Sequence, residues 1–166
     1  MRREVKKLMT AALSMAIIVA AGNTINSGAS QKKEKIPEMA FSFKLKDNYY
    51  GTKNEGNTVQ RKTSDLNNAW GVHFKTSNEE TKNNAATYTI FYIAEVIKND
   101  YNKTASAMHK IKEGTRFRYY SAYRNVSPGP TALYAKDNKD GSPSGYTVTG
   151  MWTPEAGVAP TNDGDD

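Results

Sequence analysis

The sequence contains no cysteine among its 166 residues. This absence excludes disulfide bonds, thiolate metal sites and cysteine nucleophiles, so packing alone must stabilise the fold. Histidine is also scarce: there are two, and no Gly-x-Ser-x-Gly motif accompanies them, so a serine hydrolase is not indicated. His73 and His109 could meet Glu95 in a zinc site, but no close ligand pair predicts one. We predict no catalytic residue, no metal and no cofactor.

Acidic residues are rare in the segments that have a strand-like pattern. A glycosidase needs two carboxylates that flank one cleft, and Glu95 is the one acidic residue inside a predicted strand of the central domain. The other acidic residues of this region fall in turn sequences, where carboxylates mostly serve solvation. A small extracellular enzyme is therefore the third of three interpretations.

Long apolar runs are limited to one segment near the N-terminus. Four basic residues precede the apolar residues 8–21, which count 14. A helix needs about 20 apolar residues to span the hydrocarbon core of a membrane, so the pattern predicts a signal peptide over residues 1–29 and no stable transmembrane anchor. Cleavage after Ala21 and an uncleaved anchor are the alternatives. The predicted protein is secreted.

Removal of residues 1–29 would change the charge of the protein more than its size. It takes away four basic residues and one acidic residue, which lowers the formal net charge from +6 to +3, and it leaves 137 residues. This length is enough for one hydrophobic core. Export without cysteine is more typical of a Gram-positive bacterium than of small eukaryotic extracellular domains.

Apolar residues recur at every second position through much of residues 41–154. This period predicts strands with one covered face, and turn sequences separate them. Residues 87–97 are apolar on both faces and should form a central strand. We predict an all-β domain, an antiparallel β-sandwich of roughly seven to eight strands. A flexible leader over residues 30–40 and a disordered acidic tail over residues 155–166 should flank it.

Trp152 ends the last predicted strand, and Pro154 follows closely. A tryptophan in this place is expected to cover one end of the core, while the proline ends the strand pairing. The alternative is that Trp152 belongs to a contact surface.

Residues 114–125 concentrate arginine and tyrosine. On a strand, Arg116, Arg118 and Tyr120 would share one exposed face. Guanidinium groups bind phosphate or carboxylate oxygens in a forked geometry, and both residue types are enriched at binding hot spots. A merely solvated surface is the alternative. The predicted partner is an anionic cell-wall polymer or a lipid headgroup, and export argues against nucleic acid. The predicted binding residues are Arg116, Arg118, Tyr120, Tyr123 and Arg124.

Three segments, "FSFKL", "TRFRYY" and "VTGMWTPE", carry a resemblance. The chain resembles a family of small secreted Gram-positive proteins of unknown function that end close to Gly-x-Trp-Ser-Pro. Gly150, Trp152 and Pro154 match this ending, and Thr153 stands in place of serine. The resemblance implies a cysteine-free, β-rich fold and no catalytic residue. A looser similarity links the chain to lactococcin-like bacteriocins, which are exported sandwiches that engage a cell-wall precursor.

These observations favour a secreted, non-enzymatic protein that binds a component of a cell surface or cell wall. A bacteriocin-like inhibitor of other Gram-positive cells is the alternative within the same fold.

Overall fold

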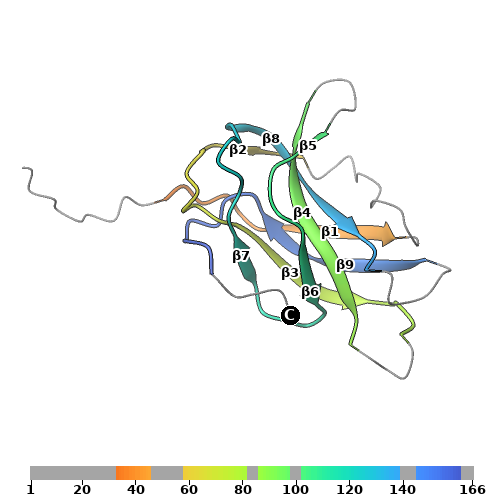
Figure 1. Ribbon diagram of the computed structural model, residues 1–166. Helices are drawn as coiled ribbons and strands as arrows, with labels where there is room; N and C mark the ends of the chain where they lie inside the picture. Colours follow the sequence, from red (N-terminus) through yellow and green to blue (C-terminus); the bar gives the residue numbers. More distant parts are fainter. Residues whose placement is uncertain (1–32, 46–57, 82–85, 98–101, 139–144, 162–166) are drawn as a thin grey trace, which may run out of the picture. The chain divides into compact units, whose positions relative to one another are not determined.

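The computed structural model of the protein describes residues 33–45, 58–81, 86–97, 102–138 and 145–161 (Figure 1). All of them belong to one compact unit, residues 31–166. The predicted signal peptide lies outside the described residues, as do residues 30–32 of the predicted leader. Among the residues that are described, no helix has the length and apolar character needed to cross a membrane.

Nine strands in the described residues form two antiparallel sheets (Figure 1). The first sheet has the order β1 (Met39–Leu45), β9 (Tyr146–Thr153), β3 (Trp70–Ser77) and β7 (Arg118–Tyr120). The second has the order β2 (Val59–Arg61), β8 (Gly129–Lys136), β4 (Tyr88–Val96) and β5 (Asn102–Thr104), and β6 (His109–Lys112) also pairs with β4. The predicted antiparallel β-sandwich is confirmed. The sequence pattern missed β5 because its residues resemble a turn.

The core lies between the two sheets and follows the predicted period of two. Trp70, Val72 and Phe74 alternate along β3 and are completely buried. The ring of Phe91 on β4 lies 5.4 Å from that of Phe41 and 5.6 Å from that of Phe74, measured between centroids, so aromatic rings join the two sheets. Such tilted ring pairs add to the free energy that burial alone provides.

The strand β4 is buried on both faces near its middle, as its sequence predicts. Phe91 and Ile93 face the core, while Tyr92 and Ala94 are buried on the opposite face. The ring of Tyr92 stacks on that of Tyr134 at a centroid distance of 5.3 Å. This central strand lies within residues 87–97, which the sequence predicts to be apolar on both faces.

A buried network joins the two ends of the described domain, and we call it the clasp. It comprises residues 33–38, the loop 61–69 and residues 153–157. At its centre is Arg61, of which 2% is exposed. Its guanidinium donates to the carbonyl oxygens of Thr63 and Asn68 at 3.0 Å and to that of Pro154. The cation therefore gathers backbone carbonyls that would otherwise lack partners in the interior.

Glu155 is the acidic member of the clasp and is completely buried. Its Oε1 accepts hydrogen bonds from the backbone N–H groups of Lys62 at 2.9 Å and Thr63 at 2.6 Å. Burial lowers the pKa of Arg61, and the charge of Glu155 opposes this change. Because arginine stays protonated even so, the clasp holds one buried positive and one buried negative charge.

The first described residues, 33–38, fall within the predicted leader over residues 30–40 and are docked in the clasp. The N–H of Ile36 donates to the carbonyl of Glu155 at 2.8 Å, and the hydroxyl of Thr153 donates to the carbonyl of Ile36 at 2.8 Å. The side chain of Asn68 donates to the carbonyl of Glu34 at 2.7 Å. Serine, which the family ending has in place of Thr153, also carries a hydroxyl. It could therefore donate the same hydrogen bond to the carbonyl of Ile36.

Residues 155–161 of the predicted tail over residues 155–166 are among those that the structure describes. Ala156 is buried like Glu155, and its N–H donates to the carbonyl of Ala69 at 2.8 Å. The N–H of Thr161 still reaches the carbonyl of Tyr119 at 3.0 Å. Hydrogen bonds therefore join Thr161, the last described residue, to the domain, and Trp152, which is completely buried, belongs to the core as expected.

We predict that Arg61→Ala lowers the free energy of unfolding by about 3 kcal/mol or more, because it leaves Glu155 as an uncompensated buried charge. The measurement is urea unfolding followed by the fluorescence of the two buried tryptophans. Gln60→Ala, an exposed neighbour on the same strand, is the control and should change stability by less than about 0.5 kcal/mol. Equal effects of the two substitutions would contradict a structural role for the clasp.

Candidate functional site

The connection from β6 to β7 crosses from the second sheet to the first, and it contains several basic residues. β6 pairs with β4 in the second sheet, and β7 pairs with β3 in the first. We call residues 109–120, which include both strands and the loop that joins them, the arch (Figure 1). Its sequence holds four basic residues and one acidic residue.

The base of the arch is closed by stacked aromatic rings. His109 at its start and Tyr120 at its end lie with ring centroids 3.7 Å apart and planes inclined by 14°. Trp70 lies against both, at 5.2 Å from Tyr120 and 5.9 Å from His109. Since Trp70 is completely buried, the arch is fixed to the core at its base.

The tip of the arch is held by hydrogen bonds to both sheets. The N–H of Glu113 donates to the carbonyl of Thr87 at 2.9 Å, and the N–H of Gly114 donates to that of Phe74 at 3.0 Å. The carboxylate of Glu113 accepts from the N–H of Ser77 at 2.9 Å. Gly114 has a φ of 74°, a conformation that favours glycine. The arch is therefore a rigid mount for its side chains.

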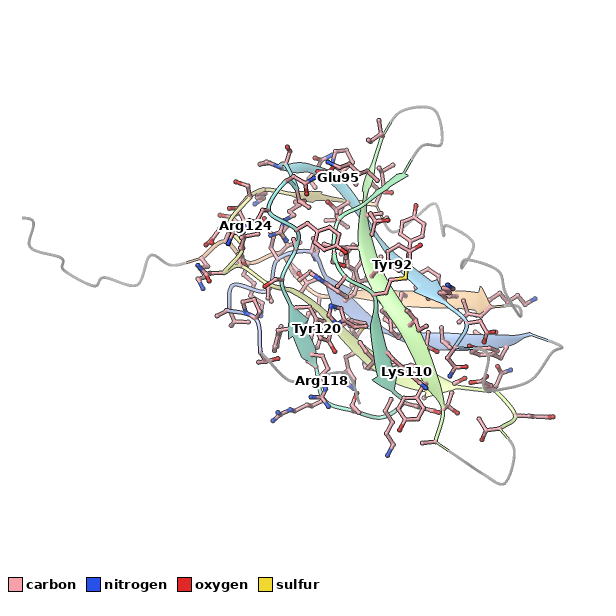
Figure 2. The ribbon with its side chains drawn as sticks, in the orientation of Figure 1. Tyr92, Glu95, Lys110, Arg118, Tyr120 and Arg124 are labelled. Atoms are coloured by element: carbon pink, nitrogen blue, oxygen red, sulfur yellow. The ribbon has the colours of Figure 1, made fainter. Side chains whose placement is uncertain are left out.

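Four cations project from this mount. Lys112 and Arg116 are exposed, and Lys110 and Arg118 are half-buried. The ammonium of Lys110 lies over the ring of Tyr88, 4.8 Å from its centroid. Figure 2 labels Arg118 and Lys110 toward the same, lower end of the view. Exposed Lys75 extends the charge onto the adjacent part of β3, near the point where the arch tip binds Phe74 and Ser77.

The structure separates the five residues that the sequence grouped as a binding surface. Arg116 and Arg118 belong to the arch, whereas Arg124 lies away from Arg118 toward the other end of the domain in Figure 2. Tyr123 is 45% exposed and adjoins Arg124. Tyr120 is 5% exposed, so the prediction that it shares an exposed face with Arg116 and Arg118 is wrong.

Two neighbouring rings explain why Tyr120 turns inward. Phe117 and Tyr119 take the outer face, stack at a centroid distance of 5.3 Å and lie over Gly71. A Cβ at Gly71 would lie 2.5 Å from the Phe117 ring, so glycine leaves the space that this ring fills. On a strand, Tyr120 must point to the opposite face from Tyr119, where Trp70 and His109 receive it.

The histidines lie on different sheets. His73 is on β3, where burial and the charge of Lys75 lower its pKa while Glu38 opposes the change. His109 is on β6 in the base of the arch, and Glu95 accepts a hydrogen bond from the N–H of Ser127 at 2.8 Å. In the described part of the chain, no group of three His, Cys, Asp or Glu side chains could hold a metal ion.

Sequence reasoning missed Lys75, Lys110 and Lys112 as members of the charged surface. Lys75 is distant from the arch along the chain, and only the fold brings it near. Lys110 and Lys112 precede the Arg/Tyr segment in a strand with weak apolar alternation, so no stripe was visible. The excess of basic over acidic residues across residues 109–120 is the signal that could have found them.

We predict that Tyr120→Ala lowers the free energy of unfolding by about 3 kcal/mol, because it removes a buried ring from the base of the arch. The exposed Tyr123→Ala should change stability by less than about 0.5 kcal/mol. Chemical unfolding of both variants measures the difference. A similar small effect at both positions would contradict the inward orientation of Tyr120.

Comparison with protein families gives a match that covers residues 27–156 and is described as "Protein of unknown function (DUF2712)". Neither the curated proteins nor the solved structures compared with the chain show a match. The match confirms the expected membership in a family without an assigned activity, while the Gram-positive origin and the similarity to bacteriocins stay predictions. Because the match covers most of the sequence, from the end of the predicted signal peptide through Ala156 of the clasp, the chain belongs to the DUF2712 family of proteins of unknown function.

Proposed function

We propose that the protein is a secreted, non-enzymatic binding protein whose arch takes a phosphate-bearing component of a cell surface. The ligand would be an anionic wall polymer or a lipid headgroup, which share phosphate oxygens as the recognised group. The observation that carries this proposal is that the backbone of the arch is fixed to both sheets. It holds four cations in place where the chain crosses from one sheet to the other: Lys110, Lys112, Arg116 and Arg118.

Rigid mounting matters because a binding protein loses affinity when it must order its own side chains and loops. The arch is fixed at its base by stacked rings and at its tip by three hydrogen bonds to the two sheets. Its backbone needs no ordering when a ligand arrives. Arginine adds a planar donor group that matches the oxygens of phosphate.

The acidic residues near this end of the described structure offset only part of its positive charge. Glu113 is engaged by the N–H of Ser77. Asp137 is 4% exposed and accepts a hydrogen bond from the hydroxyl of Tyr146 at 2.9 Å. Glu79 is 9% exposed. Exposed Glu80, exposed Glu38 beside His73 and half-buried Glu113 are fewer than the five exposed or half-buried cations of this end, so among these described residues cations outnumber carboxylates: Lys75, Lys110, Lys112, Arg116 and Arg118.

The half-buried rings of Phe117 and Tyr119 border the cations. Arginine and tyrosine side by side are the residues most enriched where proteins bind partners. A polymer or headgroup whose phosphates contact Arg116 and Arg118 could place its apolar or sugar part against these rings. The arch thus combines charge with a stacking surface.

The test is co-sedimentation of residues 30–166 with intact Gram-positive cells at low and high salt. We expect Arg116→Ala/Arg118→Ala to lower binding at low salt by about ten-fold or more, since each cation near an anionic surface contributes about 1 kcal/mol. The same two substitutions should flatten the salt dependence. Vesicles that contain phosphatidylglycerol and a soluble glycerol phosphate polymer, used in parallel, distinguish the two sources of phosphate.

The control is Lys35→Ala/Arg124→Ala, which removes the same charge from exposed positions outside the arch. It should bind nearly as well as the unmodified protein. If both double variants lose the same amount of binding, the effect is one of net charge and not of the arch. If the arch variant binds as well as the unmodified protein, the arch is not the binding site. Loss of viability of the target cells on binding would favour the bacteriocin-like alternative.

A further inference from the structure

The strand β1 is an edge of the first sheet. In the part of the chain that the structure describes, it pairs with β9, and the order of strands ends with it. Its seven residues pair without a register shift, and they include no proline. Edge strands are usually protected from the addition of another strand by shortness, a bulge, proline or charge. Of these devices, β1 has one charged residue, Lys44.

Thr147, the partner of Lys44 in β9, shows which backbone groups of β1 point to the open edge. The carbonyl of Thr147 accepts from the N–H of Asn78 at 3.2 Å, and its N–H donates to Oδ1 of Asn78 at 2.6 Å. Thr147 therefore directs its backbone groups toward β3, and its pair with Lys44 is a non-hydrogen-bonded one. The backbone groups of Lys44 then point to the open edge. Those of Ala40 and Ser42 do the same, because the direction repeats at every second residue.

The exposed face of this segment has small residues at its centre and opposite charges at its ends. Side chains of β1 alternate between the buried core and the surface. The register of β1 against β9 extends back to Lys35, which pairs with Ala156, so the chain stays alongside β9 before the strand begins. Over residues 38–45 the exposed side chains are those of Glu38, Ala40, Ser42 and Lys44. The two charges lie at equal distances along the chain from Phe41.

We propose that two copies of the protein pair through β1 in antiparallel orientation, with a twofold axis at Phe41. Each residue then lies opposite the one at the equal distance from Phe41 in the second copy, so Glu38 faces Lys44 and Ala40 faces Ser42. The backbone groups that point to the open edge meet in hydrogen-bonded pairs. Each end of this new ladder holds a cross-strand pair of opposite charges on the exposed face, which stabilises the ladder.

The charges select both this register and a second copy as the partner. A shift by two residues, which keeps the same side chains on the exposed face, places Lys44 opposite Ala40 or Ile36, and neither of these is charged. In the register with the axis at Phe41, the segment supplies both members of each charge pair itself. Self-complementary contacts of this kind are typical of twofold dimers, in which both subunits use the same surface.

Pairing through β1 leaves the arch outside the new ladder. β1 and β7 lie at opposite ends of the strand order of the first sheet, and the arch includes β7. The first sheet therefore continues into that of the second copy without the use of β7. Two arches on one particle raise the avidity for a polymer with many phosphates, and this consequence alone rests on the proposed function of the arch.

The first experiment measures association by sedimentation velocity of residues 30–166 without any ligand. We expect a monomer–dimer equilibrium that shifts toward the dimer as the protein concentration rises. Lys44→Glu places two carboxylates opposite each other at both ends of the ladder, so it should raise the dissociation constant of the dimer by about ten-fold or more. A protein that stays monomeric up to about 1 mM would overturn the proposal.

An exchange of the two charges tests the register. Glu38→Lys/Lys44→Glu restores an opposite pair at each end, so this double variant should dimerise like the unmodified protein. The control is Arg124→Glu, which changes the net charge as Lys44→Glu does, at an exposed position outside β1. It should leave the dissociation constant nearly unchanged. A loss in the double variant or in the control that equals the loss in Lys44→Glu would overturn this pairing.

The second experiment locates the interface by amide hydrogen exchange at low and high protein concentration. The N–H groups of Ala40 and Lys44 should exchange more slowly as the dimer forms, because they enter the new ladder. Those of Phe41 and Phe43 point toward β9 and should be protected at both concentrations. A dimer in which the exchange at Ala40 and Lys44 is unchanged uses another surface and contradicts the proposal. Neither experiment contains an anionic ligand, so absence of the dimer and failure of the arch to bind phosphate are separate results.

Discussion

The guanidinium of Arg61, buried among backbone carbonyls, is the interaction on which the rest of the structure depends. Its donors reach Thr63 and Asn68 in one loop and Pro154 after the last strand. The loop leads directly into Trp70, the first residue of β3, and Trp70 supports the rings at the base of the arch. Glu155 completes the clasp by binding the N–H groups of the same loop and, through its carbonyl, Ile36. A buried charge thus connects both ends of the domain to the candidate site.

The fold was accessible from the sequence wherever burial follows a simple period. Alternation placed Phe41 and Phe43, the residues of β3 and the doubly apolar β4 correctly, because one covered face of a strand needs apolar side chains at every second position. The clasp was not accessible. Arg61 and Glu155 are charged, and charged residues are mostly exposed, so the pattern assigned Glu155 to a solvated tail. Only backbone carbonyls and N–H groups distant in the sequence make their burial favourable.

The candidate site was accessible in part, for a related reason. The sequence indicated Arg116 and Arg118, but it also placed Tyr120 beside them at the surface, because alternation fixes which residues share a face and not which face is inward. Gly71 determines which face is inward. Because it has no side chain, the rings of Phe117 and Tyr119 pack over it on the outer face, and Tyr120 therefore points into the core. The fold then adds Lys75, Lys110 and Lys112 to the arginines. The result is a charged arch that is anchored by the same aromatic core that holds the sheets together.

The central claim is that this arch binds phosphate-bearing polymers. The most direct measurement is a titration of isotope-labelled residues 30–166 with inorganic polyphosphate, followed by the backbone amide resonances. The account predicts shifts concentrated at residues 110–118 and around Lys75, with the resonances near Arg124 unchanged and the shifts reversed by salt. Shifts centred on another surface, or no shifts at low salt, would contradict it.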